Sequence, residues 1–465
     1  MQAVGESAQP LAMRKSTDIC LREVELFFLP VELRVPLKFG AQTVSRVTCA
    51  RARVRVEDAL GRSAEGWGET PLNVAWVWPS ALTWEVREAR LRDFCGRLAA
   101  ALRGFVERGH PLELGDAFTR GALHLLLAEA NVGHAEPIPH LAALVCLSLF
   151  DLATYDAYGN LHARPVFDLL GEEHLSADLA QFLDGDARFS EQRPPHYLRP
   201  KQMRLPVWHL VGGLDALEPA DLTGTEPEDG YPVLLRDWIH MDGLRCLKIK
   251  LRGNDAAWDY ERIVRVGRIA MEENCEWLTA DFNCTVLDPA YVCDILDRLL
   301  AEQPRLFAML LYIEQPFPYD LAAHRIDVRS VSARKPLFLD ESAHDWRFVQ
   351  LGRELGWSGV ALKTCKTLTG ALLSLCWARA HGMTLMVQDL TNPMLAQIPH
   401  VTLAAHAGTI MGVESNGMQF SPAASLPEEK IHPGIFKRRS GVLDLSTLGP
   451  TGFGYRVEEI ARVLP

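Results

Sequence analysis

The first part of the chain alternates apolar and polar side chains in the way that antiparallel strands do. Ala50–Glu57 (ARARVRVE) places an apolar residue at every second position, which predicts a strand with one buried face. A turn at Gly61 and Arg62 follows it. Trp84–Phe105 and His140–Asp156 repeat apolar residues about every 3.6 positions and predict helices. The N-terminal part is therefore expected to be α+β.

From about residue 205 the pattern changes to short apolar runs separated by amphipathic stretches of helix length. Such alternation predicts a (β/α)₈ barrel, in which every strand is buried on both faces. From the second to the sixth expected strand, successive strand ends lie about 23 to 33 residues apart. This length suits a strand, a helix and two loops. The eight runs are Leu205–Val211, Leu244–Leu251, Trp277–Ala280, Met309–Ile313, Leu337–Leu339, Gly359–Leu362, Thr384–Val387 and Thr409–Val413.

Two segments do not fit the strand–helix alternation. Asp186–Met203 is rich in proline and arginine and predicts an irregular insertion. Gly449–Gly454 comes too late for another strand–helix unit, so we expect it to return to the first domain. The expected organisation is a disordered lead-in over 1–18, an N-terminal domain over 19–145, a barrel over 146–435 and a returning segment over 436–465.

Composition excludes several classes of protein. The formal net charge of −11 argues against a nucleic-acid partner, because phosphate binding needs a basic surface. No apolar run is long and uncharged enough to predict a membrane span, and no secretory signal follows Met1. Ten cysteines without Cys-x-x-Cys spacing favour buried thiols in a reducing compartment. We therefore expect a cytoplasmic protein with a small-molecule partner.

The strand ends carry the candidate chemistry, because barrel enzymes place their active sites at the C-terminal ends of the strands. Residues two apart on a strand face the same side, so Lys248 and Lys250 are both expected to point into the mouth. The third to fifth strands end at Asp281, Glu314 and Asp340. The last three strand ends offer Lys363, then Gln388 and Asp389, and finally Glu414.

Each of these signals has a structural alternative. Lys-x-Lys is usually a solvated strand face, and an aspartate after a strand is often a helix N-cap. Three carboxylates on successive strand ends would repel one another in a partly desolvated mouth, so a cation is expected among them. Oxygen ligands alone favour Mg²⁺, with Mn²⁺ as the alternative, over zinc. A structural cluster of salt bridges stays open as a second interpretation.

Together the charged residues at these strand ends resemble those of the enolase superfamily, in its mandelate racemase/muconate lactonizing enzyme family and specifically the muconate cycloisomerase branch. Ser148–Gly159 also resembles the family's helix before the barrel, and Gly449–Val457 its C-terminal return. The likeness covers roughly residues 20 to 460. The segments that carry it at the strand ends are Lys248-Ile-Lys250, Asp281-Phe-Asn283, Glu314-Gln-Pro316, Asp340-Glu-Ser342 and Lys363.

The resemblance implies a modified (β/α)₇β barrel, closed by an α+β capping domain that both chain ends form. It implies that the substrate loses the proton α to its carboxylate, giving an enediolate that Mg²⁺ stabilises on Asp281, Glu314 and Asp340. Lys250 and Lys363 would be the acid and base on opposite faces, with Lys248 assisting electrostatically. We prefer Lys363 to the nearby Lys366 because Lys363 directly ends an apolar run, whereas Lys366 is expected to start the next helix.

The sequence also departs from the family pattern. The branch that pairs a histidine with an aspartate does not match, because the sixth strand ends in Lys363 and the nearest histidine, His381, precedes the seventh strand. The Gly-Gly that often follows that lysine is replaced by Lys363-Thr-Cys-Lys-Thr-Leu-Thr-Gly370, which indicates a different substrate. Leu37–Thr43 occupies the place of the mobile specificity loop. Candidate substrate-binding residues are Phe39, Asn283, Glu341, Asp389 and Glu414.

Several functions share this set of residues. The first is a cycloisomerase, racemase or epimerase acting on a carboxylate. The second is a lyase, either a dehydratase or an enzyme like o-succinylbenzoate synthase, using the same lysines. A non-catalytic family member would be favoured only by the loss of a lysine or ligand, and a metal-dependent hydrolase would need histidine ligands such as His-Glu-x-x-His. We also expect a homo-oligomer.

Overall fold

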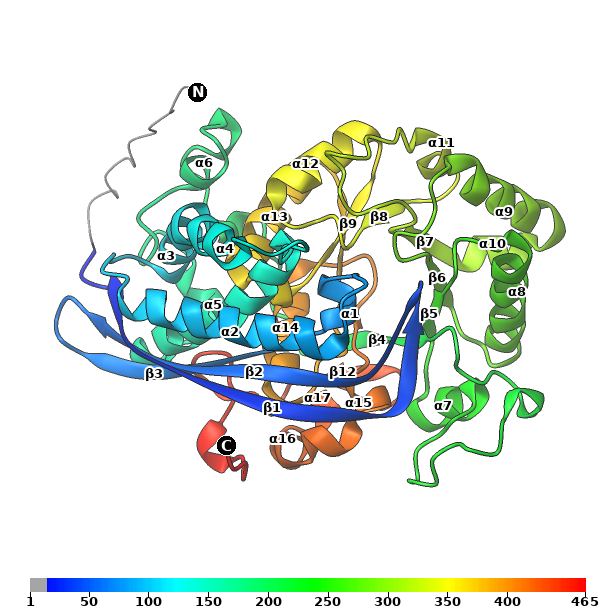
Figure 1. Ribbon diagram of the computed structural model, residues 1–465, viewed down its shortest axis with the longest axis horizontal. Helices are drawn as coiled ribbons and strands as arrows, with labels where there is room; N and C mark the ends of the chain where they lie inside the picture. The colour runs from blue at the N-terminus through cyan, green and yellow to red at the C-terminus, as the bar shows by residue number, and fades with distance from the viewer. Residues whose placement is uncertain (1–14) are drawn as a thin grey trace.

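A three-stranded antiparallel sheet begins the part of the chain that the computed structural model describes, residues 15–465 (Figure 1). The strand order is β1-β2-β3, with β1 at Ile19–Phe39, β2 at Gln42–Asp58 and β3 at Ser63–Pro71. Both β1 and β2 are far longer than an ordinary strand of about five or six residues. They therefore form an arm that reaches toward the barrel. Residues 1–14, most of the predicted lead-in, lie outside the described residues.

Helices pack against this sheet. Predicted helices over Trp84–Phe105 and His140–Asp156 are confirmed as α2 and α5, and α5 runs five residues further than expected. The helices of this part are α1 (Val74–Val77), α2 (Trp84–Arg103), α3 (Pro111–Phe118), α4 (His124–Asn131) and α5 (His140–Leu161), with a π-helical turn at Thr119–Leu123 before α4.

Glycines bring β3 into direct backbone contact with α5. A Cβ atom added to Gly68 would lie 2.0 Å from the carbonyl oxygen of Leu149, and one added to Gly66 would lie 2.0 Å from the amide nitrogen of Ala157. Both neighbours are backbone atoms of a helix, which cannot turn aside as a flexible side chain can. The interface between sheet and helix therefore depends on residues without side chains at these two positions.

Helix α5 is also the one described helix that is long and apolar enough to cross a membrane by length and composition. Its whole apolar window is buried inside the protein. It packs between the N-terminal sheet and the barrel, contacting β3 through backbone atoms. We interpret it as a core helix, whose apolar character comes from being covered on all sides.

The second sheet is built from parallel strands in the order β10-β9-β8-β7-β6-β5-β4-β11, and β12 (Val442–Asp444) pairs antiparallel with β4. Each strand overlaps one of the eight predicted runs, which confirms the runs, although β4, β6, β7 and β11 extend one residue beyond them and β11 is only two residues long. The strands are β4 (Arg204–Val211), β5 (Cys246–Lys250), β6 (Trp277–Asp281), β7 (Leu310–Glu314), β8 (Leu337–Leu339), β9 (Gly359–Leu362), β10 (Thr384–Val387) and β11 (Val413–Glu414).

This parallel sheet curls toward a barrel. Strands β10 and β11 end the row, and the amide of Ile410 donates to the carbonyl of Leu385 in β10 (2.8 Å), linking that edge to the segment before β11. Inside the curl, Trp208, Tyr312 and Phe338 pack together, with the rings of Tyr312 and Phe338 stacked 4.2 Å apart. A larger apolar core lies between the strands and the surrounding helices.

Helices connect successive strands of this sheet and cover its outer side (Figure 1). They are α7 (Leu235–Asp242), α8 (Ala256–Glu272), α9 (Pro289–Glu302), α10 (Pro304–Met309), α11 (Arg329–Ser332), α12 (Trp346–Leu355), α13 (Leu368–Ala380) and α14 (Gln397–Ala407). The remaining helices are short: α6 (Leu179–Phe182), α15 (Gly417–Phe420), α16 (Leu426–Ile431) and α17 (Pro433–Phe436).

The C-terminal segment lies against the N-terminal part. One carboxylate oxygen of Asp156, in α5, accepts from the amide of Phe453 (2.8 Å), and the other accepts from the amide of Trp67 in β3 (2.9 Å). Arg51 of β2 pairs with Glu69 of β3 and also contacts Glu428 of α16, all of them buried. The two ends of the chain are thus joined by buried polar contacts, while the exact domain boundaries stay a prediction.

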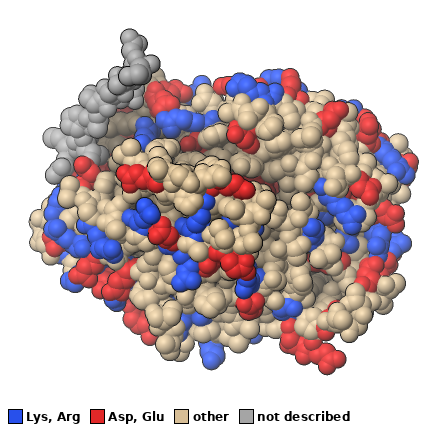
Figure 2. Space-filling model, viewed as in Figure 1, with Lys and Arg blue, Asp and Glu red and all other residues tan. Residues whose placement is uncertain are grey.

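Two further expectations are confirmed. The segment over 186–203 has no regular element beyond two 3₁₀ turns, at Ala187–Phe189 and Pro194–His196. All ten cysteines lie among the described residues as free thiols, and all except Cys284 are buried. On the face shown in Figure 2, acidic and basic side chains of the described residues are interspersed, without a broad basic area.

The contact between β3 and α5 can be tested with two alanine substitutions. Gly68→Ala should lower the midpoint of thermal unfolding, because the added methyl must push the α5 backbone away, at a cost of about 1–3 kcal/mol. Gly96→Ala is the matched control, since this exposed position within α2 has nothing within 4 Å of an added Cβ. It should raise the midpoint slightly, by the helix preference of alanine, about 1 kcal/mol. A Gly68→Ala protein as stable as wild type would contradict the contact.

Candidate active site

A row of charged side chains lies at the C-terminal ends of neighbouring strands. Asp281 at the end of β6 is the register partner of Lys250 in β5 and of Glu314 in β7. Asp340 follows β8 directly and Lys363 follows β9. The three carboxylates therefore stand between a lysine at each end of the row, and all five side chains are buried. This is the order of strand ends that the sequence predicts.

Lys248 holds three carboxylates at once. Its ammonium nitrogen lies 2.6 Å from Glu314 Oε1, 2.9 Å from Glu414 Oε2 and 3.1 Å from Asp281 Oδ2. Burial lowers the pKa of Lys248, but Glu314, Glu414 and Asp281 outweigh it and leave the pKa well above its usual value. Lys248 is therefore a permanent positive charge inside the mouth, not a solvated lysine on a strand face.

The carboxylates respond differently to this environment. Burial raises the pKa of Asp281, but Lys250 and Lys248 together bring it well below its usual value. For Glu314, burial and the neighbouring charge of Asp281 raise the pKa well above its usual value. Such divergence is expected where like charges are crowded, because Asp281 contacts two ammonium groups and Glu314 only one.

Lys250 lies under the arm of the N-terminal sheet. Its ammonium group bonds to Asp281 and lies 5.8 Å from the centre of the Phe39 ring, near the tip of the β1–β2 hairpin. The predicted loop over Leu37–Thr43 is a tight turn at Gly40 and Ala41, with Gly40 at φ +46°. A Cβ on Gly40 would lie 3.3 Å from Asn283 Cβ, so the tip rests directly on the mouth.

Two lysines lie at the other end of the row. Lys363 is 3.2 Å from Asp340 Oδ2 and donates to the carbonyl of Asp389 (3.0 Å). Lys366 donates to the carbonyls of Asp340 and Ala343 and lies 3.6 Å from Asp340 Oδ1. The sequence predicted that Lys366 would start the next helix; instead it ends a 3₁₀ turn before α13 and is buried at the site.

Trp76, in α1 of the N-terminal domain, covers this end. Its ring centre lies 5.3 Å from the ammonium of Lys363 and 5.7 Å from that of Lys366, and its Nε1 donates to Glu341 Oε1 (3.1 Å). The sequence did not single out Trp76. The available signal was a pair of tryptophans in a short segment directly after β3, Asn73–Trp78. Phe39 and Trp76 thus cover opposite ends of the row.

The candidate substrate-binding residues fall into two groups. Asn283 Nδ2 donates to Glu341 Oε1 (3.1 Å), while Glu341 Oε2 is buried without a hydrogen-bond partner among the described residues. Asp389 accepts from the amides of Asn392 (3.2 Å) and Asn416 (2.7 Å), so its carboxylate organises loops. Glu414 is paired with Lys248 and with Asn416. Among these candidates, Asn283 and Glu341 therefore each keep an oxygen atom without a partner in the described chain, and Phe39 offers an aromatic face near Lys250.

Second-layer amides orient the carboxylates, and the sequence analysis missed their role. Gln315 Oε1 accepts from the amide of Asp340 (2.7 Å) and from the hydroxyl of Ser342 (2.7 Å). Gln388 donates to Glu314. Asn416 Nδ2 donates to Glu414 Oε1 (2.8 Å). These amides thereby hold the carboxylates of Glu314 and Glu414 and the backbone at Asp340 in place.

The carboxylate oxygens at the strand ends are possible ligands for a divalent metal ion. As placed, the described residues 15–465 contain no group of three His, Cys, Asp or Glu side chains arranged around a metal position. The chemistry of the donors nevertheless fits: Asp281, Glu314 and Asp340 offer only oxygen, and Asp340 Oδ1 is buried without a hydrogen-bond partner in the described chain. Asp281 and Asp340 repel the carboxylate of Glu314 and so raise its pKa, and a cation bound among them would reduce this repulsion.

Comparison with known proteins gives the family. Residues 232–461 match the model described as enolase C-terminal domain-like. The N-succinyl Arg/Lys racemase from Bacillus cereus is 16% identical over 95% of this chain and 98% of its own, with a TM-score of 0.60. The 2-chloromuconate cycloisomerase from Rhodococcus opacus is 18% identical over 96% and 100%, with a TM-score of 0.59.

A third similar structure is a dipeptide epimerase from Enterococcus faecalis in complex with Mg and the dipeptide L-Leu-L-Tyr. It is 15% identical over 94% of this chain and 99% of its own, with a TM-score of 0.59. No curated protein matches in sequence. At such identities the solved structures establish a shared fold, and the family model covers strands β5 to β12 with their charged ends. Over residues 232–461 the chain therefore belongs to the enolase C-terminal domain-like family of mandelate racemase and muconate lactonizing enzymes.

Proposed function

We propose that the protein is a Mg²⁺-dependent isomerase that removes the proton α to a substrate carboxylate and delivers a proton during the same turnover. The observation that carries this proposal is the placement of Lys250 and Lys363 at the two ends of the carboxylate row. The similar structures include a racemase, an epimerase and a cycloisomerase by name, which supports this reaction class over others. The barrel would then be of the modified (β/α)₇β kind, capped by both chain ends.

Asp281, Glu314 and Asp340 would hold the metal ion, since they are the oxygen donors on three successive strand ends. A bound Mg²⁺ would supply positive charge to the substrate carboxylate as its α-carbon becomes acidic, as enolase-superfamily sites do in general. Lys248 already contacts two of these carboxylates and adds a further fixed positive charge. Such preorganised charge is required because an α-proton is too weakly acidic for an unaided lysine.

Lys250 and Lys363 would carry the protons. Lys250 is positioned by Asp281, whereas Lys363 is positioned by Asp340 and by the carbonyl of Asp389. Because strands β6 to β8 separate them, a substrate over the carboxylates has one lysine on each side. Phe39 and Trp76 cover these lysines and would keep water away from them. This gives a two-base arrangement that suits inversion or migration at the α-carbon.

The first prediction concerns the two lysines. Lys250→Ala and Lys363→Ala should each lower α-proton exchange by about 10²–10⁴-fold, because each removes a proton carrier. Exchange is measured by proton NMR in D₂O against a panel of dipeptides, N-acyl amino acids and acid sugars. Products of elimination in the same spectra would identify the protein as a lyase.

Lys366→Ala is the matched comparison, since Lys366 is an equally buried lysine three residues from Lys363. It should keep exchange above that of Lys363→Ala, because Lys366 is tied to two backbone carbonyls. The assignment is wrong if Lys366→Ala loses exchange while Lys363→Ala retains it. Full exchange in Lys250→Ala would exclude Lys250 as a proton carrier.

The second prediction concerns the metal. Mg²⁺ should bind the wild-type protein in titration calorimetry and raise its unfolding midpoint, because binding stabilises only the folded state. Asp281→Asn should lose most of both effects by removing one of the three carboxylates of the row. Asp294→Asn is the control, since Asp294 is exposed on α9. A wild-type protein that gives no Mg²⁺ signal would favour a structural cluster of salt bridges.

The third prediction concerns Glu341, which we place beside the substrate. Burial, together with Asp340 and Asp281, raises its pKa to about 7. Folding therefore favours the protonated form of Glu341. The contribution of this group to the free energy of unfolding is fully present below its unfolded pKa of about 4.3 and is lost as pH rises through 7.

In EDTA, wild-type protein should lose unfolding free energy from this group between pH 5 and 8, by about 3 kcal/mol at most. Glu341→Gln keeps an acceptor for Trp76 and Asn283 but cannot ionise, so the loss should be smaller. Chemical denaturation at each pH measures the difference between the two proteins. Identical pH profiles would show that Glu341 is not held near neutrality.

A further inference from the structure

The β1–β2 hairpin is interrupted before it reaches the active site. Its ladder is regular up to Glu32 and resumes only at Leu37, so residues 33–36 of β1 lie outside the pairing with β2. A ladder interrupted in this way lets the strand bend locally. Beyond the interruption lies the tip of the hairpin, residues 37–44. The position of the tip therefore depends on contacts outside the hairpin as well as on the strands that lead to it.

Arg34 lies within this interruption and bonds to a long loop between β4 and α7, residues 212–234. Its guanidinium group donates to both carboxylate oxygens of Asp229, at 2.6 and 2.8 Å. It also donates to the carbonyls of Tyr231 (3.2 Å) and Pro232 (3.1 Å). The Arg34 side chain is only 7% exposed, so water competes little for its N–H groups. Paired bonds from a guanidinium to a carboxylate fix orientation as well as distance.

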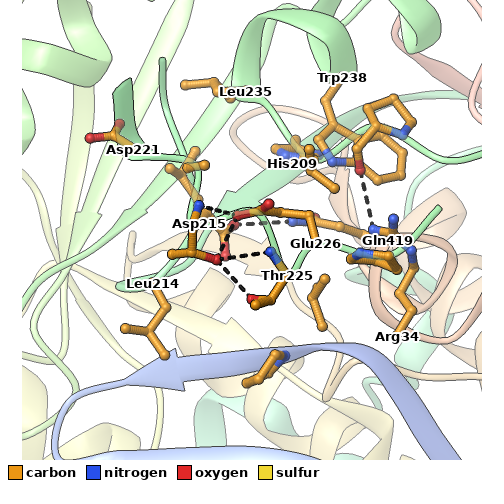
Figure 3. Close-up of a pocket in the computed structure, with 18 residues that line it drawn as sticks. Arg34, His209, Leu214, Asp215, Asp221, Thr225, Glu226, Leu235, Trp238 and Gln419 are labelled. Carbon is orange, nitrogen blue, oxygen red and sulfur yellow. Dashed lines mark hydrogen bonds between the residues drawn. The ribbon is translucent and has the colours of Figure 1, made fainter. Parts of the chain in front are cut away.

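The loop over residues 212–234 is itself fixed to the barrel. Arg265 of α8 pairs with Asp221 at 2.8 Å, and Arg268 of α8 pairs with Glu218 at 2.7 Å. A space of about 220 Å³ remains between this loop, the arm of β1 and β4, and Arg34 lines it (Figure 3). Because packing between the loop and the arm is incomplete there, the bonds of Arg34 take a larger share in holding the two segments together.

The tip covers Lys250. The centre of the Phe39 ring lies 5.8 Å from the Lys250 ammonium group, and the carbonyl of the adjacent Lys38 accepts from the amide of Gly213 in the loop (2.9 Å). The loop therefore bonds to β1 both within the interruption, at Arg34, and beyond it, at Lys38. We propose that this loop is a latch that keeps the tip over Lys250, with Arg34 as its positioning residue. The contacts define the latch, whereas its benefit to catalysis rests on the proposed function.

Cys284 offers a chemical probe of the tip. It follows Asn283, whose Cβ would lie 3.3 Å from a Cβ on Gly40 at the turn of the tip, and it is the one described cysteine that is not buried. Labelling of the full chain by N-ethylmaleimide is followed by mass spectrometry. Arg34→Met should raise the labelling rate of Cys284 at least about threefold, because the tip opens more often without this ion pair. An unchanged rate would overturn the proposal.

The other cysteines report on general unfolding. All of them are buried, so a variant that had only lost stability would label them faster as well. In Arg34→Met their labelling should stay as slow as in the wild type, because the broken pair joins the tip to the loop and not the parts of the core. Faster labelling of every cysteine would show a merely structural role for Arg34 and would overturn the proposal.

Asp229→Asn tests the partner of Arg34. It should also speed the labelling of Cys284, and the double variant should react no faster than Arg34→Met alone, because both changes break the same contact. Glu228→Gln is the matched control, since Glu228 is an exposed neighbour in the same loop, and it should label as the wild type does. Rates that multiply in the double variant, or a Glu228→Gln protein as fast as Asp229→Asn, would overturn the proposal.

Hydrogen exchange of backbone amides gives a measurement that is independent of cysteine chemistry. In Arg34→Met the amides of the tip should exchange faster, whereas those of residues 46–55, in the regular part of the ladder, should not change. Faster exchange throughout β2 would overturn the proposal. Neither measurement needs a substrate. The latch can therefore be confirmed even if the wild-type protein shows no α-proton exchange, and it can fail while the proposed reaction stands.

Discussion

The structure depends on balancing buried charge at the ends of the parallel strands. Five carboxylates and four lysines are withdrawn from water there, and each would be costly alone. Their arrangement follows from strand register, since neighbouring parallel strands bring their last residues side by side. Removing one of these side chains leaves a buried partner without its opposite charge or hydrogen bond. The chemistry of the mouth and the stability of the barrel are therefore coupled. These residues are Lys248, Lys250, Asp281, Glu314, Asp340, Glu341, Lys363, Lys366 and Glu414.

The same balance explains why the N-terminal domain must stay in contact with the barrel. Phe39 and Trp76 place aromatic faces over Lys250 and Lys363. An aromatic face attracts an ammonium group more strongly when water is excluded. Both residues come from segments outside the barrel, and the buried group of Arg51, Glu69 and Glu428 holds the two parts together. The cover therefore comes from the N-terminal part of the chain, which ion pairs join to α16, and not from a loop of the barrel.

Much of this arrangement could be predicted from sequence, because parallel barrel strands are apolar runs and functional residues gather where they end. The strands over 337–339, 359–362 and 384–387 were predicted to the residue. The order of carboxylates and lysines followed from the same pattern. The length of β11 was overestimated because an apolar run indicates burial and not hydrogen bonding. Residues 409–412 are half-buried but form no strand ladder, although Ile410 makes a single bond to Leu385 of β10.

Contacts between distant segments could not be predicted in this way. Nothing in local periodicity says that Trp76 lies over Lys363, or that Lys366 folds back onto Asp340, because both depend on how two domains meet. Asp389 and Glu414 have the residue type and position of substrate ligands, yet their oxygens are used by Asn416 and Lys248. A single sequence shows which groups are available at the mouth but not which of them the protein has already engaged.

The contact between Asp156 and Phe453 has a consequence for how the protein is made. Asp156 is buried, and its side chain joins α5 to a segment almost three hundred residues later. At synthesis rates of about 5–20 residues per second, roughly 15 to 60 seconds pass before Phe453 emerges from the ribosome. Throughout that interval the N-terminal domain exposes the surface that the last segment covers. Until the segment around Phe453 has been made, that surface is therefore open to contacts that the folded protein no longer allows.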